Sequence, residues 1–305
     1  MTKRLLVFGS INLDLGLQVP QAPRAGETVL GTGPQLSPGG KGANQAHAAR
    51  LYGADVRLVG RVGSDTLGAQ ALAMLRAAGV DLSGVGHDER HATGLATVMV
   101  LPGGDNAIVV GPGANAALLA RHAAESATSS ACGLLLQMEV PAAESMAVAR
   151  RVRAAGGWVM LNLAPARDVD LIEPALIDWL VVNGQELQAL CAALTLPAGP
   201  PEAQAAAVAA AWGCTTVVTL GAQGALSCSP DGTLLRMAAR PVSARDTTGA
   251  GDTFCGVLAA AWLEAPDPAT ALRAACTAAS LACLKPGAQA AQPLRSEIDD
   301  ALAHP

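Results

Sequence analysis

The chain has 305 residues, of which 51% are hydrophobic and 15% are charged, and this composition argues against a disordered protein. The formal net charge is -5 and only 2% of the residues are aromatic, so no nucleic-acid partner is expected. Seven cysteines without a Cys-x-x-Cys pair argue against a disulfide framework or a zinc ribbon and indicate the cytoplasm, and no apolar run reaches the length that spans a membrane.

The first predicted strand, residues 5–8, is apolar and is followed by Gly9-Ser10-Ile11-Asn12-Leu13-Asp14. Asn12 and Asp14 stand at alternate positions, so we expect both side chains to point the same way at the carboxyl end of the strand, where open α/β sheets bind ligands. An amide beside a carboxylate can donate to and accept from the neighbouring hydroxyls of a sugar. Because Asn and Asp are also favoured in turns, an ordinary turn is the alternative.

Residues 15–36 and 94–110 are predicted to form a small β-sheet that stands off the main domain. Glycines and prolines alternate there with short apolar stretches, which favours short strands over a helix. The exposed edges of such a sheet could be covered by a second copy of the chain, so a homodimer is expected.

A glycine-rich loop, Gly39-Gly40-Lys41-Gly42-Ala43-Asn44, precedes a predicted helix. It is not a Walker P-loop, because Gln35 stands where the first glycine is required and Gly42 where a Ser or Thr would bind magnesium. The consecutive glycines would instead let backbone amides, together with Lys41 and Asn44, approach a small polar ligand closely.

Further predicted strands, at residues 56–59, 133–138, 158–163, 179–182 and 216–220, alternate with predicted helices. This alternation is typical of an α/β protein with a doubly wound, mainly parallel sheet flanked by helices. Glu139 and Asn183 follow two of these strands, so we expect them at the carboxyl edge of the sheet. Asn183 and Glu186 also have the spacing of a helix capping box, so a purely structural role is the alternative for this pair.

The segment Asp246-Thr247-Thr248-Gly249-Ala250-Gly251-Asp252 leads directly into an apolar helical run. Free N–H groups and the positive end of a helix dipole attract an anion, and small side chains would let a phosphate approach. Asp252 would repel that anion. This cost suggests that Asp252 accepts the proton of a hydroxyl that attacks a phosphoryl group. A plain helix N-terminus with an early aspartate is the alternative.

These motifs, in this order, resemble those of the ribokinase-like (PfkB-type) carbohydrate kinases over nearly the whole chain. The joined motifs Gly9 to Asp14 and Gly39 to Gln45 are most similar to those of the family members that phosphorylate ribose. The resemblance implies one kinase domain over residues 1–305, with segments 15–36 and 94–110 as a lid over the sugar. It also implies the transfer of the γ-phosphate of ATP to the 5-hydroxyl of D-ribose.

The resemblance further implies roles for individual residues. Asp252 would be the general base, and the backbone amides of Gly249, Ala250 and Gly251 would form the anion hole. The sugar would contact Asn12, Leu13, Asp14, Gly40, Lys41, Gly42, Ala43, Asn44, Glu139 and Asp252. ATP and the water shell of Mg²⁺ would contact Asn183, Glu186, Thr219, Leu220, Gly221, Ala222, Gln223, Gly224, Gly251 and Asp252, with Cys276 beside the adenine.

An activating monovalent cation, normally K⁺ in this family, would be bound by Asp246, Thr248, Ala282, Lys285, Gly287 and Ala291. Two of the implied residues depart from the family pattern. Ala291 stands where a serine is usual at the cation loop, and Cys276 stands near where a His or Asn usually borders the adenine.

Two other functions remain as alternatives, and a third is disfavoured. The chain could phosphorylate deoxyribose or another small sugar, or it could be a sugar- or nucleotide-binding regulator without turnover. A dinucleotide-dependent oxidoreductase is disfavoured, because no Gly-x-Gly-x-x-Gly follows a predicted strand.

Overall fold

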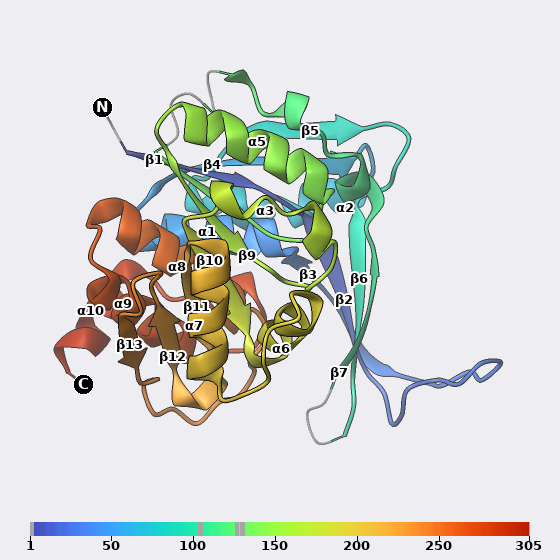
Figure 1. Cartoon of the computed structure of the whole chain (residues 1–305). Coiled ribbons are helices and arrows are strands. Elements are labelled where there is room, and N and C mark those ends of the chain that lie inside the picture. The colour runs from blue at the N-terminus through green and yellow to red at the C-terminus, as the bar shows by residue number, and fades with distance from the viewer. Residues whose placement is uncertain (1–2, 103–105, 126–127, 129–131, 305) are drawn as a thin grey trace.

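The computed structural model describes residues 3–102, 106–125, 128 and 132–304, and in these residues the strands form two sheets (Figure 1). The strands of the larger sheet are β1 (Arg4–Phe8), β4 (Asp55–Gly63), β5 (Asp81–Asp88), β8 (Gly133–Leu136), β9 (Trp158–Asn162), β10 (Trp179–Asn183), β11 (Thr215–Thr219), β12 (Ala225–Cys228) and β13 (Leu234–Met237). Their order is β13-β12-β11-β10-β9-β8-β1-β4-β5. All neighbours from β11 to β5 pair in parallel, whereas β12 and β13 pair antiparallel.

Strand β1 shows why these segments form a buried parallel sheet. Its residues Leu5, Leu6, Val7 and Phe8 are all fully buried, and successive side chains point to opposite faces. Leu5 and Val7 belong to one hydrophobic core, and Leu6 and Phe8 belong to the other. A continuous apolar run is expected where helices cover both faces of a sheet.

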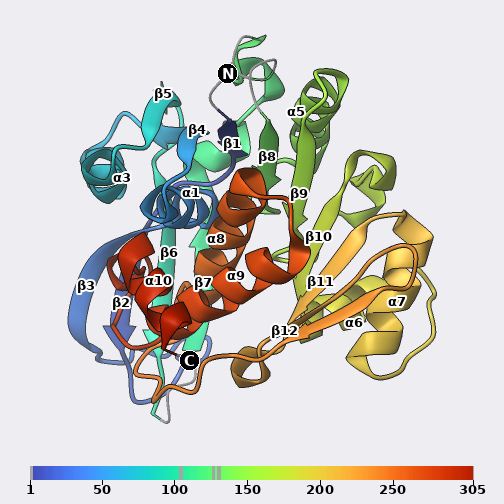
Figure 2. The same ribbon diagram turned by 90° about the vertical axis from the view of Figure 1, so that its left-hand side faces the viewer.

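Helices cover both faces, which confirms the predicted doubly wound α/β architecture. The α-helices are α1 (Lys41–Tyr52), α2 (Thr66–Ala71), α3 (Ala73–Ala78), α5 (Ala142–Ala154), α6 (Gly184–Ala193), α7 (Pro201–Trp212), α8 (Ala250–Glu264), α9 (Pro268–Ala282) and α10 (Arg295–Ala303). Figure 2 shows α1, α8 and α9 on one side of the large sheet and α5, α6 and α7 on the other. No helix in the described part of the chain combines the length and the hydrophobicity needed to cross a bilayer.

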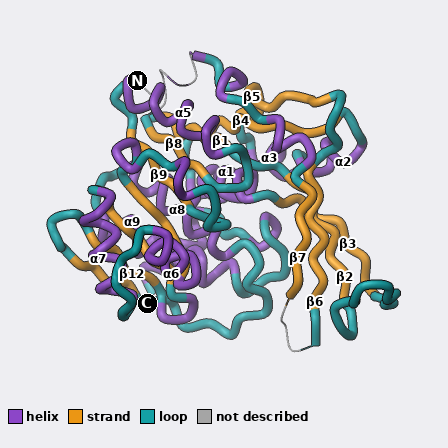
Figure 3. Tube along the Cα trace, turned by 45° about the vertical axis from the view of Figure 1, so that its right-hand side comes forward, coloured by secondary structure: helices purple, strands orange, loops and turns teal. Residues whose placement is uncertain are grey.

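The second sheet contains the segments predicted to form a lid, and it projects from one end of the large sheet (Figure 3). We keep the name lid for this sheet, and its position over a sugar stays a prediction. Its strands are β2 (Asn12–Gln18), β3 (Thr32–Gly39), β6 (Gly94–Val100) and β7 (Asn106–Gly111), in the order β3-β2-β6-β7. Residues 103–105, inside the predicted lid segment 94–110, lie outside the described residues. That the chain is one domain over residues 1–305 stays a prediction.

The lid is longer than predicted. Asn12 pairs with Gly39 and with Gly94, so the sheet begins three residues before position 15 and extends beyond position 36. Asn12 and Asp14 therefore lie among the first three residues of strand β2, so the alternative of an ordinary turn is wrong. Backbone pairing with two distant strands holds this segment extended, which a local turn preference does not reveal.

Candidate active site

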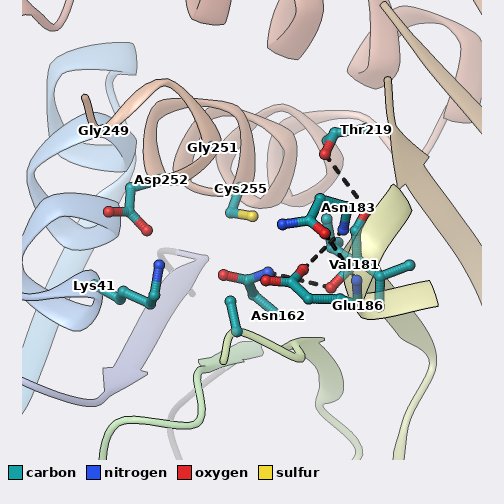
Figure 4. A pocket seen from close by; sticks show the side chains of 12 residues that line it. Lys41, Asn162, Val181, Asn183, Glu186, Thr219, Gly249, Gly251, Asp252 and Cys255 are labelled. Atoms are coloured by element: carbon teal, nitrogen blue, oxygen red, sulfur yellow. Dashed lines mark hydrogen bonds between the residues drawn. The ribbon is translucent and has the colours of Figure 1, made fainter. Parts of the chain in front are cut away.

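Several polar residues end neighbouring strands of the large sheet and line one cavity (Figure 4). Asn162 ends β9, Asn183 ends β10 and Thr219 ends β11, so all three lie at the carboxyl edge, as expected for Asn183. The full lining consists of Lys41, Asn162, Ala164, Val181, Val182, Asn183, Glu186, Thr219, Gly249, Gly251, Asp252 and Cys255.

The first turn of α8 forms one wall of this cavity. Gly249 precedes the helix with a positive φ of 73°, a conformation that glycine adopts readily. Among the described residues, the amides of Gly251 and Asp252 have no acceptor, and a Cβ placed on Gly251 would meet no atom within 4 Å. Two free N–H groups and open space at a helix N-terminus are suited to a phosphate.

The amide of Ala250 is engaged in a turn in this structure, and its role in an anion hole stays a prediction. The N–H of Ala250 donates to the carbonyl of Thr247 over 3.2 Å and thereby closes the turn that precedes α8. The anion-hole roles of Gly249, Ala250 and Gly251 stay predictions, and the amide of Asp252 is a further N–H group beside them without an acceptor among the described residues.

Asp252 is 7% exposed, and α1 holds its carboxylate at both oxygens. Asn44 Nδ2 donates to Oδ2 over 2.9 Å, and Gln45 Nε2 donates to Oδ1 over 3.0 Å. The N-cap of α8 is Gly249, which makes no side-chain capping bond. The alternative that Asp252 merely caps its own helix is therefore wrong, and the carboxylate borders the cavity instead.

The side-chain nitrogen of Lys41 points toward Asp252 (Figure 4). The charge of Asp252 raises the pKa of Lys41 above its ordinary value, and Glu139 adds to this effect, against the opposing effect of burial. Lys41 therefore stays an ammonium at neutral pH and can attract phosphate oxygens. Glu139 in turn accepts from the Lys41 backbone N–H over 3.0 Å and from the Ser10 hydroxyl over 2.6 Å, so it anchors the start of α1.

Asp14 and Asn12 form a second polar group on the lid side. Asn12 Oδ1 accepts from Asn115 Nδ2 over 2.7 Å, and Asn115 Oδ1 accepts from the Ile11 N–H over 2.9 Å. Because that N–H can only donate, the orientation of both amides is fixed, and the Asn12 Nδ2 remains available to a ligand. Asp14 Oδ1 is buried without a hydrogen-bond partner, and burial, together with Glu139 and Asp252, raises the pKa of Asp14 to about 7.

Not every residue of the implied sugar site can offer its side chain. Leu13 and Ala43 are buried in the hydrophobic core. The N–H of Ala43 donates to the Ser10 carbonyl, and that of Gly42 donates to the Ser10 hydroxyl. These residues thus fix the approach of α1 to the first strand, while Lys41 and Asn44 present polar side chains.

The capping-box alternative for Asn183 and Glu186 is confirmed. Asn183 Oδ1 accepts from the Glu186 N–H and Glu186 Oε2 accepts from the Asn183 N–H, both over 2.8 Å. The same two side chains line the cavity, and burial raises the pKa of Glu186. The capping box therefore fixes a carboxylate and an amide at the cavity, and a ligand role is compatible with it.

Some implied nucleotide residues lie away from this cavity. Thr219 lines it, but residues 220–224 do not, and they fold back in a turn in which the Leu220 N–H donates to the Gly224 carbonyl over 2.8 Å. Cys276 is 4% exposed in α9, and its thiol donates to the Met237 carbonyl over 3.8 Å. Their contacts with a nucleotide stay predictions.

The two segments of the implied cation site meet at Asp246. Its Oδ1 accepts from the Thr248 hydroxyl over 2.6 Å, and its Oδ2 accepts from the Gly287 N–H over 2.8 Å. Burial opposes ionisation, but these hydrogen bonds outweigh it and lower the pKa of Asp246. The Ala282 carbonyl accepts the Lys285 N–H over 3.4 Å, and Ala291 is buried. The loops are thus adjacent, and the binding of K⁺ there stays a prediction.

Among the residues at or beside the cavity with polar or thiol side chains, the sequence analysis missed Gln45, Asn162 and Cys255. Asn162 is a polar residue at the end of an apolar strand, the same signal that identified Asn183. Cys255 lies three residues after Asp252, on the same side of α8. Gln45 could not be found in this way, because its partners come from distant segments.

Comparisons with known proteins agree with this architecture. The model of the pfkB family of carbohydrate kinases matches residues 2–295. The ribokinase of Bacillus subtilis is 37% identical over 308 residues, covering 99% of this chain and 100% of the relative, and that of Haemophilus influenzae is 35% identical over 308 residues and 100% of both chains. The structure of Arabidopsis thaliana ribokinase complexed with ribose and ATP matches 100% of both chains with a TM-score of 0.90 and 31% identity.

A doubly wound sheet with a lid and a helix N-terminus at its carboxyl edge thus occurs here together with the sequence motifs of sugar kinases. The chain belongs to the pfkB family of carbohydrate kinases.

Proposed function

We propose that this kinase transfers the γ-phosphoryl group of ATP to the 5-hydroxyl of D-ribose. The observation that carries the proposal is the position of Asp252, a buried carboxylate at the start of α8 that lines the same cavity as Lys41 and Gly251. The similarity to ribokinases, one of them solved with ribose and ATP, supports the choice of substrates.

In the proposed reaction Asp252 accepts the proton of the sugar hydroxyl as that oxygen attacks the γ-phosphorus, while the bond from this phosphorus to the bridging oxygen breaks and ADP leaves. The N–H groups of Gly251 and Asp252, with the ammonium of Lys41, stabilise the charge on the phosphoryl oxygens. Loss of one such donor typically slows the reaction by roughly 10²- to 10³-fold. Asn44 and Gln45 hold the base in place before the substrate arrives.

Asn183 and Glu186 would hold Mg²⁺ through its water shell. Glu186 Oε2 is used in the capping box, whereas no donor to Oε1 occurs among the described residues, and oxygen ligands suit Mg²⁺. Bound there, Mg²⁺ would neutralise the charge of the phosphates. K⁺ would be held by Asp246 and by carbonyls of the loop from Ala282 to Ala291.

On the lid side, Asn12 donates to a sugar hydroxyl and Asp14 accepts from one. A buried oxygen without a partner costs about 1–3 kcal/mol, and a hydroxyl of the substrate would remove that cost at Asp14. A cytoplasmic location, expected from the cysteine pattern, stays a prediction.

A coupled assay for ADP release tests the proposal. With purified protein, ATP and Mg²⁺, we expect the highest kcat/KM for D-ribose among a panel of 2-deoxyribose, fructose, arabinose and adenosine. A preference for another sugar would overturn the substrate assignment. An absence of sugar-dependent ADP release across the panel, with sugar binding intact by calorimetry, would favour a regulatory protein.

The proposal includes a homodimer that forms through the lid. Leu36 and Val109 are 50% and 64% exposed, and strand pairing places them in one row across the sheet. Apolar rows of this kind are typical of surfaces that a partner covers. We expect a dimer in sedimentation equilibrium, and a monomer for Val109→Glu. The matched control Leu171→Glu, at a site that is 48% exposed outside the lid, should stay dimeric, and a monomeric native protein would contradict the proposal.

A further inference from the structure

Gln45 connects the carboxylate of Asp252 to the carboxyl edge of the large sheet. Its side chain is fully buried and does not line the cavity. Nε2 donates to Asp252 Oδ1 and to Asn162 Oδ1, both over 3.0 Å, and Oε1 accepts from Gln137 Nε2 over 2.8 Å. Both N–H groups of the amide are thus in use, and one of them is directed at the proposed base.

A main-chain carbonyl fixes the orientation of this amide. Asn162 Nδ2 donates to the Val181 carbonyl over 3.1 Å, and a carbonyl can only accept. Asn162 therefore presents its side-chain oxygen to Gln45, and Gln45 must donate to it through its side-chain nitrogen. The same nitrogen is the one that reaches Asp252. The donor at Asp252 Oδ1 is consequently determined by the backbone of β10.

Close contact between α1 and α8 brings Gln45 within reach of Asp252. A Cβ placed on Gly256, one turn after Asp252, would lie 2.4 Å from the Gln45 carbonyl oxygen, so no side chain fits at this position. The two helices thus touch through their backbones at Gly256. At this separation the side chain of Gln45 spans the remaining distance to the carboxylate.

We propose that Gln45 is a positioning residue for the phosphoryl transfer, an inference that rests on the proposed role of Asp252. Asn44 holds one carboxylate oxygen, and a single donor leaves the carboxylate free to rotate about its bond to Cβ. The second donor, Gln45, fixes that rotation, so that the remaining lone pairs of Asp252 face the cavity. Gln45 does not line the cavity itself, so it acts on the substrate through the lining residues that it holds, and of its two lining partners, Asp252 and Asn162, only Asp252 is the proposed base.

Gln45→Met tests this role, since methionine fills a similar volume without a hydrogen-bonding amide. We expect kcat to fall roughly 10- to 100-fold, as for a misplaced catalytic group, while the KM values for ribose and ATP stay within about threefold. Gln204→Met is the matched control, because Gln204 is also buried but lies in α7. It should leave kcat unchanged. A weaker variant, Gln137→Met, removes only the amide that supports Gln45, and we expect a smaller loss of kcat with the same KM values.

A double-mutant cycle with Asp252→Asn separates positioning from general destabilisation. If Gln45 acts through Asp252, adding Gln45→Met to Asp252→Asn changes the residual kcat by less than about threefold. An equal fold-loss in both backgrounds, or a wild-type kcat in Gln45→Met, overturns the inference. If instead the native protein lacks ribose-dependent ADP release, or Asp252→Asn keeps full turnover, then the proposed function has failed.

Discussion

The two aspartates of the site, the buried Asp252 and the half-buried Asp14, have very different numbers of hydrogen-bond donors. Both oxygens of Asp252 accept from side-chain amides of α1. One oxygen of Asp14 is buried without any partner among the described residues, and its pKa is raised to about 7. In the ligand-free protein both oxygens of Asp252 thus have a hydrogen-bond donor, whereas Oδ1 of Asp14 has none among the described residues.

This difference agrees with the two roles proposed for the residues. A general base must be held in one geometry before the reaction, because a displaced base loses rate. A substrate-binding group gains most when the substrate itself supplies the missing hydrogen bond, since the ligand then removes a cost that the free protein carries. The same substitution, Asp to Asn, should therefore affect different kinetic constants at the two positions.

Asp252→Asn should have the largest effect. Loss of the base is expected to lower kcat by roughly 10²- to 10⁴-fold, with ribose binding close to that of the native protein. The measurements are the coupled ADP assay and calorimetric titration with ribose. The new amide would present N–H groups to Asn44 or Gln45, which are themselves donors, so the free energy of unfolding should also fall by about 1–3 kcal/mol. Turnover near that of the native protein would refute the role of Asp252.

Asp14→Asn should instead act on binding. A hydrogen bond to a charged group contributes about 1.5–3 kcal/mol, so we expect the KM for ribose to rise roughly 10- to 100-fold with a smaller change in kcat. Steady-state kinetics with ribose and 2-deoxyribose provide the control. We expect Asp14 to accept from the 2-hydroxyl, which 2-deoxyribose lacks. The native protein should therefore discriminate between the two sugars, and Asp14→Asn should discriminate much less. Equal discrimination by both proteins would show that Asp14 does not contact the 2-hydroxyl.

Much of this site could be predicted from local sequence patterns. The apolar runs gave the strands, and polar residues directly after them, such as Glu139 and Asn183, lie at the carboxyl edge as expected. The order of elements placed the start of α8 near the same edge. These features depend on residues close together in the chain, whose spacing reports directly on the structure.

The hydrogen-bond partners could not be predicted in this way. Gln45 and Asp252 are 207 positions apart, and they meet because α1 and α8 touch at Gly256. The amide of Ala250 is used by a turn whose closure depends on the positive φ of Gly249. Both features follow from backbone geometry and helix packing, which residue type and spacing alone do not determine.

The last prediction concerns the stability of the ligand-free protein and not its activity. The pKa of Asp14 is raised from 3.8 to about 7, so the folded state keeps a proton that the unfolded state has lost. The free energy of unfolding should therefore decrease as pH rises from about 4 to about 7, by an amount on the order of a few kcal/mol. Asp14→Asn lacks this titration, while the other ionisable groups are common to both proteins. Urea unfolding of each protein at pH 5, 6, 7 and 8 should thus show the variant gaining stability relative to the native protein as pH rises, and parallel curves would mean that Asp14 is ordinarily solvated.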